Sequence, residues 1–359
     1  MNKILTIIIP TYNMEKYLRR CLDSLIIDEE GMKQLEVLVI NDGSKDSSSK
    51  IAHEYQDKYP NTFRVIDKEN GNYGSCINRG LKEATGKYVK VLDADDWFDN
   101  NNFKLYIKYI SRIEADMILS ACSKINDIGN EVGGFGLPFK WSFKIYPIKT
   151  LNMEQRTSIQ MHCVTYKTDI LRQIGYTQLE GISYTDQLWV TYPMAAVKSY
   201  AVFNRILYMY LVGRDGQTMD ISVQNKKFND EISVSNRIIE WIEENPQSGV
   251  DYEYIKQKMV SRICYLYDNH CVCGLYNEDE FRGFANNLAK KMPVLVKKAE
   301  IICGKKNQIN FISNYNKGIA ISDGQFLSHQ KTTSNDNIIK GFIKYVLNNI
   351  NDFYLTKRL

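Results

Sequence analysis

Short apolar runs alternate with amphipathic segments through the first 92 residues, and this alternation constrains the fold more than any other feature. The apolar runs, rich in β-branched residues, predict buried strands at 5–9, 35–40, 64–67 and 88–92. The intervening segments have apolar residues at helical spacing, which predicts helices at 17–25, 47–59 and 74–84. A serine-rich stretch favours a cap at the start of the second helix. Three successive strand–helix–strand units predict an α/β fold with a parallel sheet that helices cover on both faces.

Polar clusters follow three of the four predicted strands. They are Pro10-Thr11-Tyr12-Asn13, Asn41-Asp42-Gly43-Ser44 and Asp93-Ala94-Asp95-Asp96. Any one cluster is consistent with a turn, because Asn, Asp, Gly and Ser dominate turns. Right-handed crossovers, however, place the carboxyl ends of all these strands at one edge, where α/β sheets bind ligands. Three clusters at that edge predict a ligand-binding site.

The third cluster places three carboxylates within four positions, directly after an apolar strand. Like charges this close raise one another's pKa and destabilise the fold unless a cation compensates them. The pattern favours a hard divalent ion, which would neutralise the carboxylates and keep coordination positions open for substrate phosphates. The alternative is an acidic loop at a helix start. Neither a glycine-rich dinucleotide fingerprint nor a P-loop is present, so we predict a nucleotide whose pyrophosphate is held by metal.

Composition restricts the class of protein and its partners. The chain of 359 residues is 44% hydrophobic and 25% charged, as expected of a globular protein and not of a disordered one. A net charge of +4 argues against a nucleic-acid binder. The eight cysteines form no Cys-x-x-Cys pair, which favours a reducing compartment. Because the apolar N-terminal run is too short for a signal peptide, and no apolar run has the length of a membrane span, we expect a cytoplasmic protein.

A change of periodicity near residue 220 predicts two domains, 1–218 and 219–359. Before the change, we expect a further strand at 117–123 and a glycine-rich loop or hairpin at 129–138. After it, apolar stripes predict helices at 228–244, 252–268 and 278–291, so the second domain is expected to be mainly helical. We expect this domain to contact an acceptor, a membrane or another subunit.

Lysines are concentrated in the second domain. Residues 290–306 contain six lysines and one acidic residue, Glu300. The tail adds Lys340, Lys344, Lys357 and Arg358 around apolar residues. This pattern is typical of a solvated helix face. The alternative is peripheral attachment to anionic lipid at the inner face of the cell membrane.

The succession of the three polar clusters resembles family 2 of the glycosyltransferases, which have the GT-A fold, and the similarity covers roughly residues 3–215. The resemblance implies a nucleotide-sugar donor and an Mn²⁺ or Mg²⁺ cofactor. It also implies that Asp93 binds the ribose and that Asp95 binds the metal. The residues that it implies for binding the nucleoside are Pro10, Thr11, Tyr12, Asn13 and Asp42.

Three further segments resemble the family less closely. Asn78 is implied on the donor side, although Ile77 replaces an arginine common in the family, and a helix-turn asparagine is the alternative. Asp186 is the candidate general base, with Thr185 in place of the usual glutamate. The alternative is that Thr185 or Asp186 caps a helix, in which case Asp169 and Glu180 are the next candidate bases. Arg214 and Gln217 lie in a closing segment that reaches the diphosphate, and a surface arginine is the alternative.

From this resemblance we expect an inverting, metal-dependent transferase that uses a nucleotide-diphospho-sugar, with a UDP-sugar as the expected donor. The expected acceptor is a glycan or a lipid-linked sugar in cell-surface polysaccharide synthesis. One alternative is a D-x-D phosphatase or phosphotransferase with Asp93 as nucleophile, although such a motif usually follows the first strand. The other is a non-catalytic carbohydrate-binding protein that retains the nucleotide fold.

Overall fold

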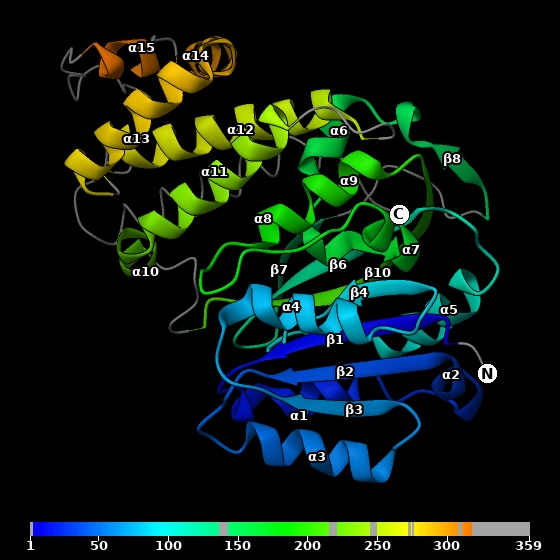
Figure 1. Ribbon diagram of the computed structural model, residues 1–359. Helices are drawn as coiled ribbons and strands as arrows, with labels where there is room; N and C mark the ends of the chain where they lie inside the picture. The colour runs from blue at the N-terminus through cyan, green and yellow to red at the C-terminus, as the bar shows by residue number, and fades with distance from the viewer. Residues whose placement is uncertain are drawn as a thin grey trace. The chain divides into compact units, whose positions relative to one another are not determined.

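The computed structural model describes residues 3–135, 143–214, 221–244, 250–271, 274, 276–307 and 311–317 (Figure 1). The predicted strands of the first 92 residues are present. They are β1 (Leu5–Thr11), β2 (Leu35–Asn41), β3 (Phe63–Asp67) and β4 (Tyr88–Val91). All four are parallel and lie side by side in the order β3-β2-β1-β4. The α/β class predicted from the sequence is therefore confirmed.

Helices follow these strands, as the periodicity predicts. The helices are α1 (Glu15–Asp23), α2 (Glu29–Gln34), α3 (Ser48–Lys58), α4 (Asn72–Glu83) and α5 (Asn100–Ile110). Ile7, Ile8 and Ile9 of β1 are all fully buried. Because successive side chains of a strand point to opposite faces, this burial means that both faces of the sheet are covered.

The second half of the sheet is mixed, whereas the predicted strand–helix–strand units concern the first half, which is parallel. A ten-stranded sheet continues beyond β4 in the order β9-β6-β10-β5. β9 (Val164–Lys167) runs antiparallel between β4 and β6 (Met117–Asn126). β10 (Ser199–Val212) is parallel to β6, and β5 (Trp97–Phe98) is antiparallel to β10.

The remaining strands and short helices of this region complete its fold. The glycine-rich segment after β6 forms a hairpin with β7 (Glu131–Phe135) as far as the described residues extend, and β8 (Ile145–Pro147) pairs with β10. The short helices are η1 (Ile148–Thr150), α6 (Met153–Ser158), η2 (Met161–Cys163), α7 (Thr168–Gln173), α8 (Asp186–Trp189) and α9 (Tyr192–Ala196).

The chain divides into two compact units. Unit 1 consists of Met1–Thr218 and Asn236–Ile255, and unit 2 consists of Met219–Ser235 and Lys256–Leu359. The predicted domain division after residue 218 stays a prediction, because residues 236–255 group with unit 1.

Helices make up the described part of the chain after residue 220. They are α10 (Ile221–Lys226), α11 (Phe228–Glu243), α12 (Tyr252–Cys271), α13 (Glu278–Lys291), α14 (Pro293–Asn307) and α15 (Phe311–Asn316). Three of them begin at the residues predicted from the apolar stripes. In unit 2, Phe228 stacks on Tyr276, and Arg262 forms a buried ion pair with Glu231. Within the described residues, none of the helices combines the length and apolarity needed to cross a bilayer.

Gly80 of α4 allows this helix to approach β1 closely. A Cβ atom at Gly80 would lie 2.5 Å from Cγ2 of the buried Ile8. We expect Gly80→Ala to lower the free energy of unfolding by about 1–3 kcal/mol, as overpacking of a core does. Denaturant titration measures this change. Gly283→Ala is the control, because Gly283 is exposed in α13 and no atom lies within 4 Å of its added Cβ. That substitution should instead stabilise by about 0.5–1 kcal/mol, and equal effects of the two would contradict the close packing.

Candidate active site

Hydrogen bonds join the loop after β1 to the loop after β2, so the first two polar clusters lie together. The backbone N–H of Asn13 donates to Ser44 Oγ at 3.0 Å, and Asn13 Oδ1 accepts from the Lys45 N–H at 2.7 Å. Asn13 has φ 54°, a left-handed conformation that asparagine tolerates. The Met14 N–H donates to Ser48 Oγ at 2.7 Å. Asn13 therefore fixes one loop against the other.

The serine-rich start of α3 has a different role from the predicted cap. Ser47 occupies the cap position, but its side chain makes no cap hydrogen bond. Its N–H instead donates to Glu15 Oε2 at 2.9 Å, and the Ser48 N–H donates to Asp46 Oδ1 at 2.9 Å. The prediction of a serine side-chain cap is therefore wrong: Glu15 binds the Ser47 N–H across the two loops, and Asp46 binds the Ser48 N–H within one loop.

Asp42 is buried at the end of β2 and binds a lysine that the sequence did not single out. Its Oδ1 accepts from Lys68 Nζ at 2.5 Å and from the Gly71 N–H at 3.0 Å. Lys68 also donates to Ser75 Oγ at 2.9 Å. Lys68 directly follows β3, so its place at the ligand-binding edge of the sheet was the available signal. A fourth polar run, Lys68-Glu69-Asn70-Gly71-Asn72, follows β3 at this edge.

Thr11 and Tyr12 differ in exposure at the end of β1. Thr11 is buried, its hydroxyl donates to the Ile9 carbonyl at 3.2 Å, and its own carbonyl accepts from the Asp42 N–H at 2.8 Å. Tyr12 is 46% exposed. Thr11 therefore holds the strand ends together, while Tyr12 presents a ring to solvent beside Asp42. Pro10, the residue before Thr11, is partly exposed within the otherwise buried strand.

The three carboxylates after β4 each have a different partner. Asp93 Oδ1 accepts from the Tyr73 hydroxyl of α4 at 2.8 Å. Asp95 Oδ2 accepts from Arg214 Nε at 2.5 Å, and the Asp95 carbonyl accepts from Arg20 at 2.8 Å. These contacts come from α4, α1 and the end of β10, so elements far apart in the sequence converge on one short segment.

The carboxylate of Asp96 is bound by β10. Its two carboxylate oxygens accept from the Tyr208 hydroxyl and the Leu211 N–H of β10, both at 2.7 Å. Burial raises the pKa of Asp96 well above its usual value, and the nearby Asp95 and Asp93 raise it further. Asp96 therefore anchors β10 to the third cluster.

Asp186 belongs to the same group of carboxylates, although it is 93 positions from Asp93 in the sequence. The pKa of Asp93 is raised to about 7 by burial first, then by the charge of Asp95, with a smaller contribution from Asp186. Burial raises the pKa of Tyr73 and Tyr210, and nearby carboxylates, Asp186 among them, raise it further. The structure thus brings the candidate base close to the third cluster.

The backbone around Asp186 is unusual. Tyr184 has φ 60°, which a bulky residue adopts only when the surrounding structure holds it. Thr185 is the residue before α8, but its side chain makes no cap hydrogen bond, and its buried Oγ1 has no partner among the described residues. A capping role for Thr185 is therefore wrong. Gln187 Nε2 donates to Asp186 Oδ2 at 3.0 Å.

Asn78 joins α4 to the segment that leads to Asp186. Its amide donates to the Gln178 carbonyl at 3.0 Å and to Glu180 Oε1 at 2.8 Å, and its Oδ1 accepts from the Gln178 N–H at 2.8 Å. None of these contacts involves the carboxylate cluster, so a direct contact of Asn78 with the donor stays a prediction. Of the two alternative bases, Glu180 is bound to Asn78, and Asp169 is exposed in the first turn of α7.

Arg214 is paired with a buried carboxylate, so its interpretation as an ordinary surface arginine is wrong. Its guanidinium also lies 5.7 Å from the centre of the Tyr17 ring. Gln217, the other predicted residue of this segment, lies outside the described residues.

The donor set at this edge fits a divalent cation. Oxygens of Asp93 and Asp96 and a ring nitrogen of His162 all lie within 4.8 Å of one another. His162 Nδ1 is buried and has no partner among the described residues, which argues against a satisfied core histidine. The pKa of His162 is lowered to about 3 by burial and by Lys90 and Lys124, so its ring is neutral, as metal binding requires. Asp95 is outside this group and is bound to Arg214.

Comparisons with known proteins agree with this geometry. The family model described as "Glycosyl transferase family 2" matches residues 6–175. The uncharacterized glycosyltransferase MG025 of Mycoplasma genitalium is 40% identical over 120 residues, which is 33% of this chain and 39% of that protein. The minor teichoic acid biosynthesis protein GgaB of Bacillus subtilis is 29% identical over 248 residues, which is 67% of this chain and 27% of GgaB. The chain thus spans less than half the length of these two relatives.

Solved structures show the same fold. The crystal structure of S. aureus TarS 1–349 in complex with UDP-GlcNAc has a TM-score of 0.63 and 18% identity, and the match covers 92% of this chain and 99% of that one. This likeness confirms the GT-A fold predicted from the sequence. Residues 6–175, which contain the three polar clusters, are thus the part of the chain that is similar to glycosyltransferase family 2.

Proposed function

We propose that this protein transfers a sugar from a nucleotide-diphospho-sugar to an acceptor hydroxyl, with inversion at the anomeric carbon. The observation that carries the proposal is the convergence of Asp186 on the crowded Asp93 and Asp95. A carboxylate beside the donor-binding edge is placed to take a proton from an acceptor, and Arg214 lies at the same edge to bind phosphate.

Donor binding follows from the partners of the first two clusters. Lys68 and the Gly71 N–H bind Oδ1 of Asp42. They fix the carboxylate so that Oδ2 can accept the imide N–H of a uracil base. Tyr12 offers an exposed ring for stacking on the base, and Asp93 accepts from the ribose. Asn13 holds the loops in this arrangement.

The transfer step uses three groups of this chain. Asp186 takes the proton of the acceptor hydroxyl as that oxygen attacks the anomeric carbon, and the bond from that carbon to the diphosphate oxygen breaks. Arg214 stabilises the charge that develops on the departing nucleoside diphosphate. Asp95 would hold Mn²⁺ or Mg²⁺ beside the group formed by Asp93, Asp96 and His162. Such an ion would supply positive charge to the same leaving group.

The names of the relatives support the choice of donor and pathway. TarS is described in complex with UDP-GlcNAc, and GgaB is named for minor teichoic acid biosynthesis. By analogy, we infer a UDP-sugar as donor and a glycan or lipid-linked sugar as acceptor, in the synthesis of a cell-surface polysaccharide at the cytoplasmic side of the membrane.

The two alternative functions fit the site less well. A phosphatase with Asp93 as nucleophile would usually place its motif after the first strand, whereas Asp93 follows β4 and accepts from Tyr73. A non-catalytic carbohydrate-binding protein would have no use for a carboxylate held beside the donor edge by a strained backbone. Release of nucleotide from a UDP-sugar separates transfer from mere binding.

Asp186→Asn tests the base. We expect turnover to fall about 10²–10⁴-fold, which is the usual contribution of a positioned base. UDP affinity and melting temperature should be nearly unchanged, because the amide keeps the size of the side chain. Asp169→Asn is the control, because it removes an exposed carboxylate in the first turn of another helix and should retain activity. If Asp186→Asn keeps most of its activity, the base lies elsewhere.

Asp95→Ala tests the metal site through binding rather than activity. We expect calorimetric UDP titrations of the variant to give the same affinity with Mn²⁺ and with EDTA, whereas the unmodified protein should bind more tightly with Mn²⁺. Asp57→Ala removes an exposed carboxylate from α3 and should preserve that difference. Equal affinities under both conditions in the unmodified protein would refute the metal assignment.

Asp42→Asn tests the base-binding role. The substitution should cost about 1.5–3 kcal/mol of UDP affinity, which is the worth of a hydrogen bond to a charged group. Since the charge that Lys68 binds is also lost, the melting temperature must be measured alongside, and affinity compared at a temperature where both proteins are folded. An unchanged UDP dissociation constant would remove Asp42 from the donor site.

A further inference from the structure

Exposed apolar side chains of unit 2 gather on α14. Among the described residues of this unit, the large hydrophobic side chains that are most exposed are Val294, Ile301 and Ile302, at 66%, 52% and 45%. The other exposed side chains of this kind belong to unit 1. An apolar group of this kind marks an interaction surface more often than isolated exposure does.

The helical repeat places these residues on one side of α14. At 100° per residue, positions 294, 298 and 301 lie nearly in line, with 297 and 302 on either flank. Opposite them, Met292, Leu295, Ala299 and Cys303 are buried in the unit. We call Val294, Lys297, Lys298, Ile301 and Ile302 the α14 outer face. Since other residues supply the core contacts of the helix, the outer face is not needed for packing.

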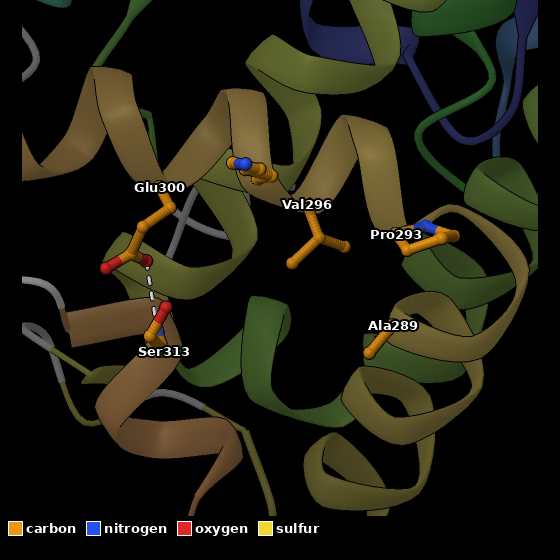
Figure 2. A pocket seen from close by; sticks show the side chains of 6 residues that line it. Ala289, Pro293, Val296, Glu300 and Ser313 are labelled. Atoms are coloured by element: carbon orange, nitrogen blue, oxygen red, sulfur yellow. Dashed lines mark hydrogen bonds between the residues drawn. The ribbon is translucent and has the colours of Figure 1, made fainter.

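The charge of this region is positive. Lys297 and Lys298 of the outer face are exposed, as are Lys290 and Lys291 at the end of α13. The acidic residue within 290–306, Glu300, is turned away from the outer face. Its Oε2 accepts from the Ser313 N–H of α15 at 3.0 Å, as Figure 2 shows.

Glu300 instead lines a cavity of about 200 Å³ with Ala289, Pro293, Val296, Lys297 and Ser313 (Figure 2). Lys297 therefore lies at the border between the cavity and the outer face. No acidic side chain from α14 itself offsets the lysines of the outer face.

We propose that the α14 outer face lies on the surface of an anionic lipid bilayer. Lysines attract anionic headgroups, and their long stems let the charge reach the headgroups while valine and isoleucine enter the boundary with the acyl chains. This combination of alternating basic and apolar residues is complementary to such a surface. Contact with the same face of a second copy would instead bring lysines against lysines.

The proposal goes beyond the transfer reaction and does not depend on it. A catalytically inactive Asp186→Asn variant should bind vesicles as the unmodified protein does. Loss of the proposed activity and loss of the proposed lipid contact can therefore be told apart.

Co-sedimentation of the full chain with vesicles tests the outer face. We expect binding to vesicles of phosphatidylcholine and phosphatidylglycerol in equal parts, and little binding to phosphatidylcholine alone. The triple variant Val294→Gln, Ile301→Gln, Ile302→Gln replaces the apolar side chains by a polar residue that favours the helix, and it should bind at least about tenfold more weakly. Ile128→Gln is the control, because Ile128 is 75% exposed in unit 1.

Charge is tested separately. Lys297→Glu with Lys298→Glu should weaken binding at least about tenfold, while the exposed pair Lys108→Glu with Lys149→Glu leaves it nearly unchanged. Equal binding by the triple variant and the unmodified protein would overturn the proposal. So would a dimer in analytical ultracentrifugation that the triple variant converts to monomer, because the outer face would then bind a second copy.

Discussion

Mutual repulsion among the carboxylates after β4 is the constraint on which the arrangement of unit 1 depends. Each charge is relieved by a group from a different element: Asp93 by the hydroxyl of Tyr73, Asp95 by Arg214, and Asp96 by two donors of β10. The need to satisfy these oxygens draws α4 and β10 to the end of one short strand. The edge of the sheet is therefore organised around a charge that the protein itself only partly neutralises.

The part of the site that follows from local pattern was predicted well from the sequence. Alternating apolar and amphipathic segments fix where β1, β2 and β4 end, so their polar clusters had to share an edge. Lys68 was missed because the polar run after β3, Lys68-Glu69-Asn70-Gly71-Asn72, is also typical of a turn, and nothing local indicates that Lys68 binds Asp42. Asp186 could be proposed as the base only by resemblance, because nothing in the local sequence distinguishes it from a helix cap. Asp186 comes close to Asp93 only in the folded chain.

Tertiary context explains the errors. The antiparallel β9 has four residues, and its pairing with β4 and β6 depends on partners far away in the sequence. The long strand β10 was not predicted because its apolar pattern is interrupted near Asn204 and Arg205, where its register with β6 shifts. The serine cap of α3 failed because Ser47 makes no cap hydrogen bond, and the hydroxyl of the next serine, Ser48, binds the Met14 N–H of the loop after β1. The helices of the second half depend on a local repeat and were predicted closely.

The contact between Arg214 and Asp95 has a thermodynamic consequence. An anion that takes the Nε–H of the guanidinium must displace the carboxylate, so anion binding there is an exchange of partners rather than the addition of a new ion pair. The displaced carboxylate is then free to accept a cation, and a cation that takes Asp95 frees Arg214 in return. Each ligand raises the affinity for the other by the same factor. Anion and cation occupancy at this edge are thereby linked through one salt bridge.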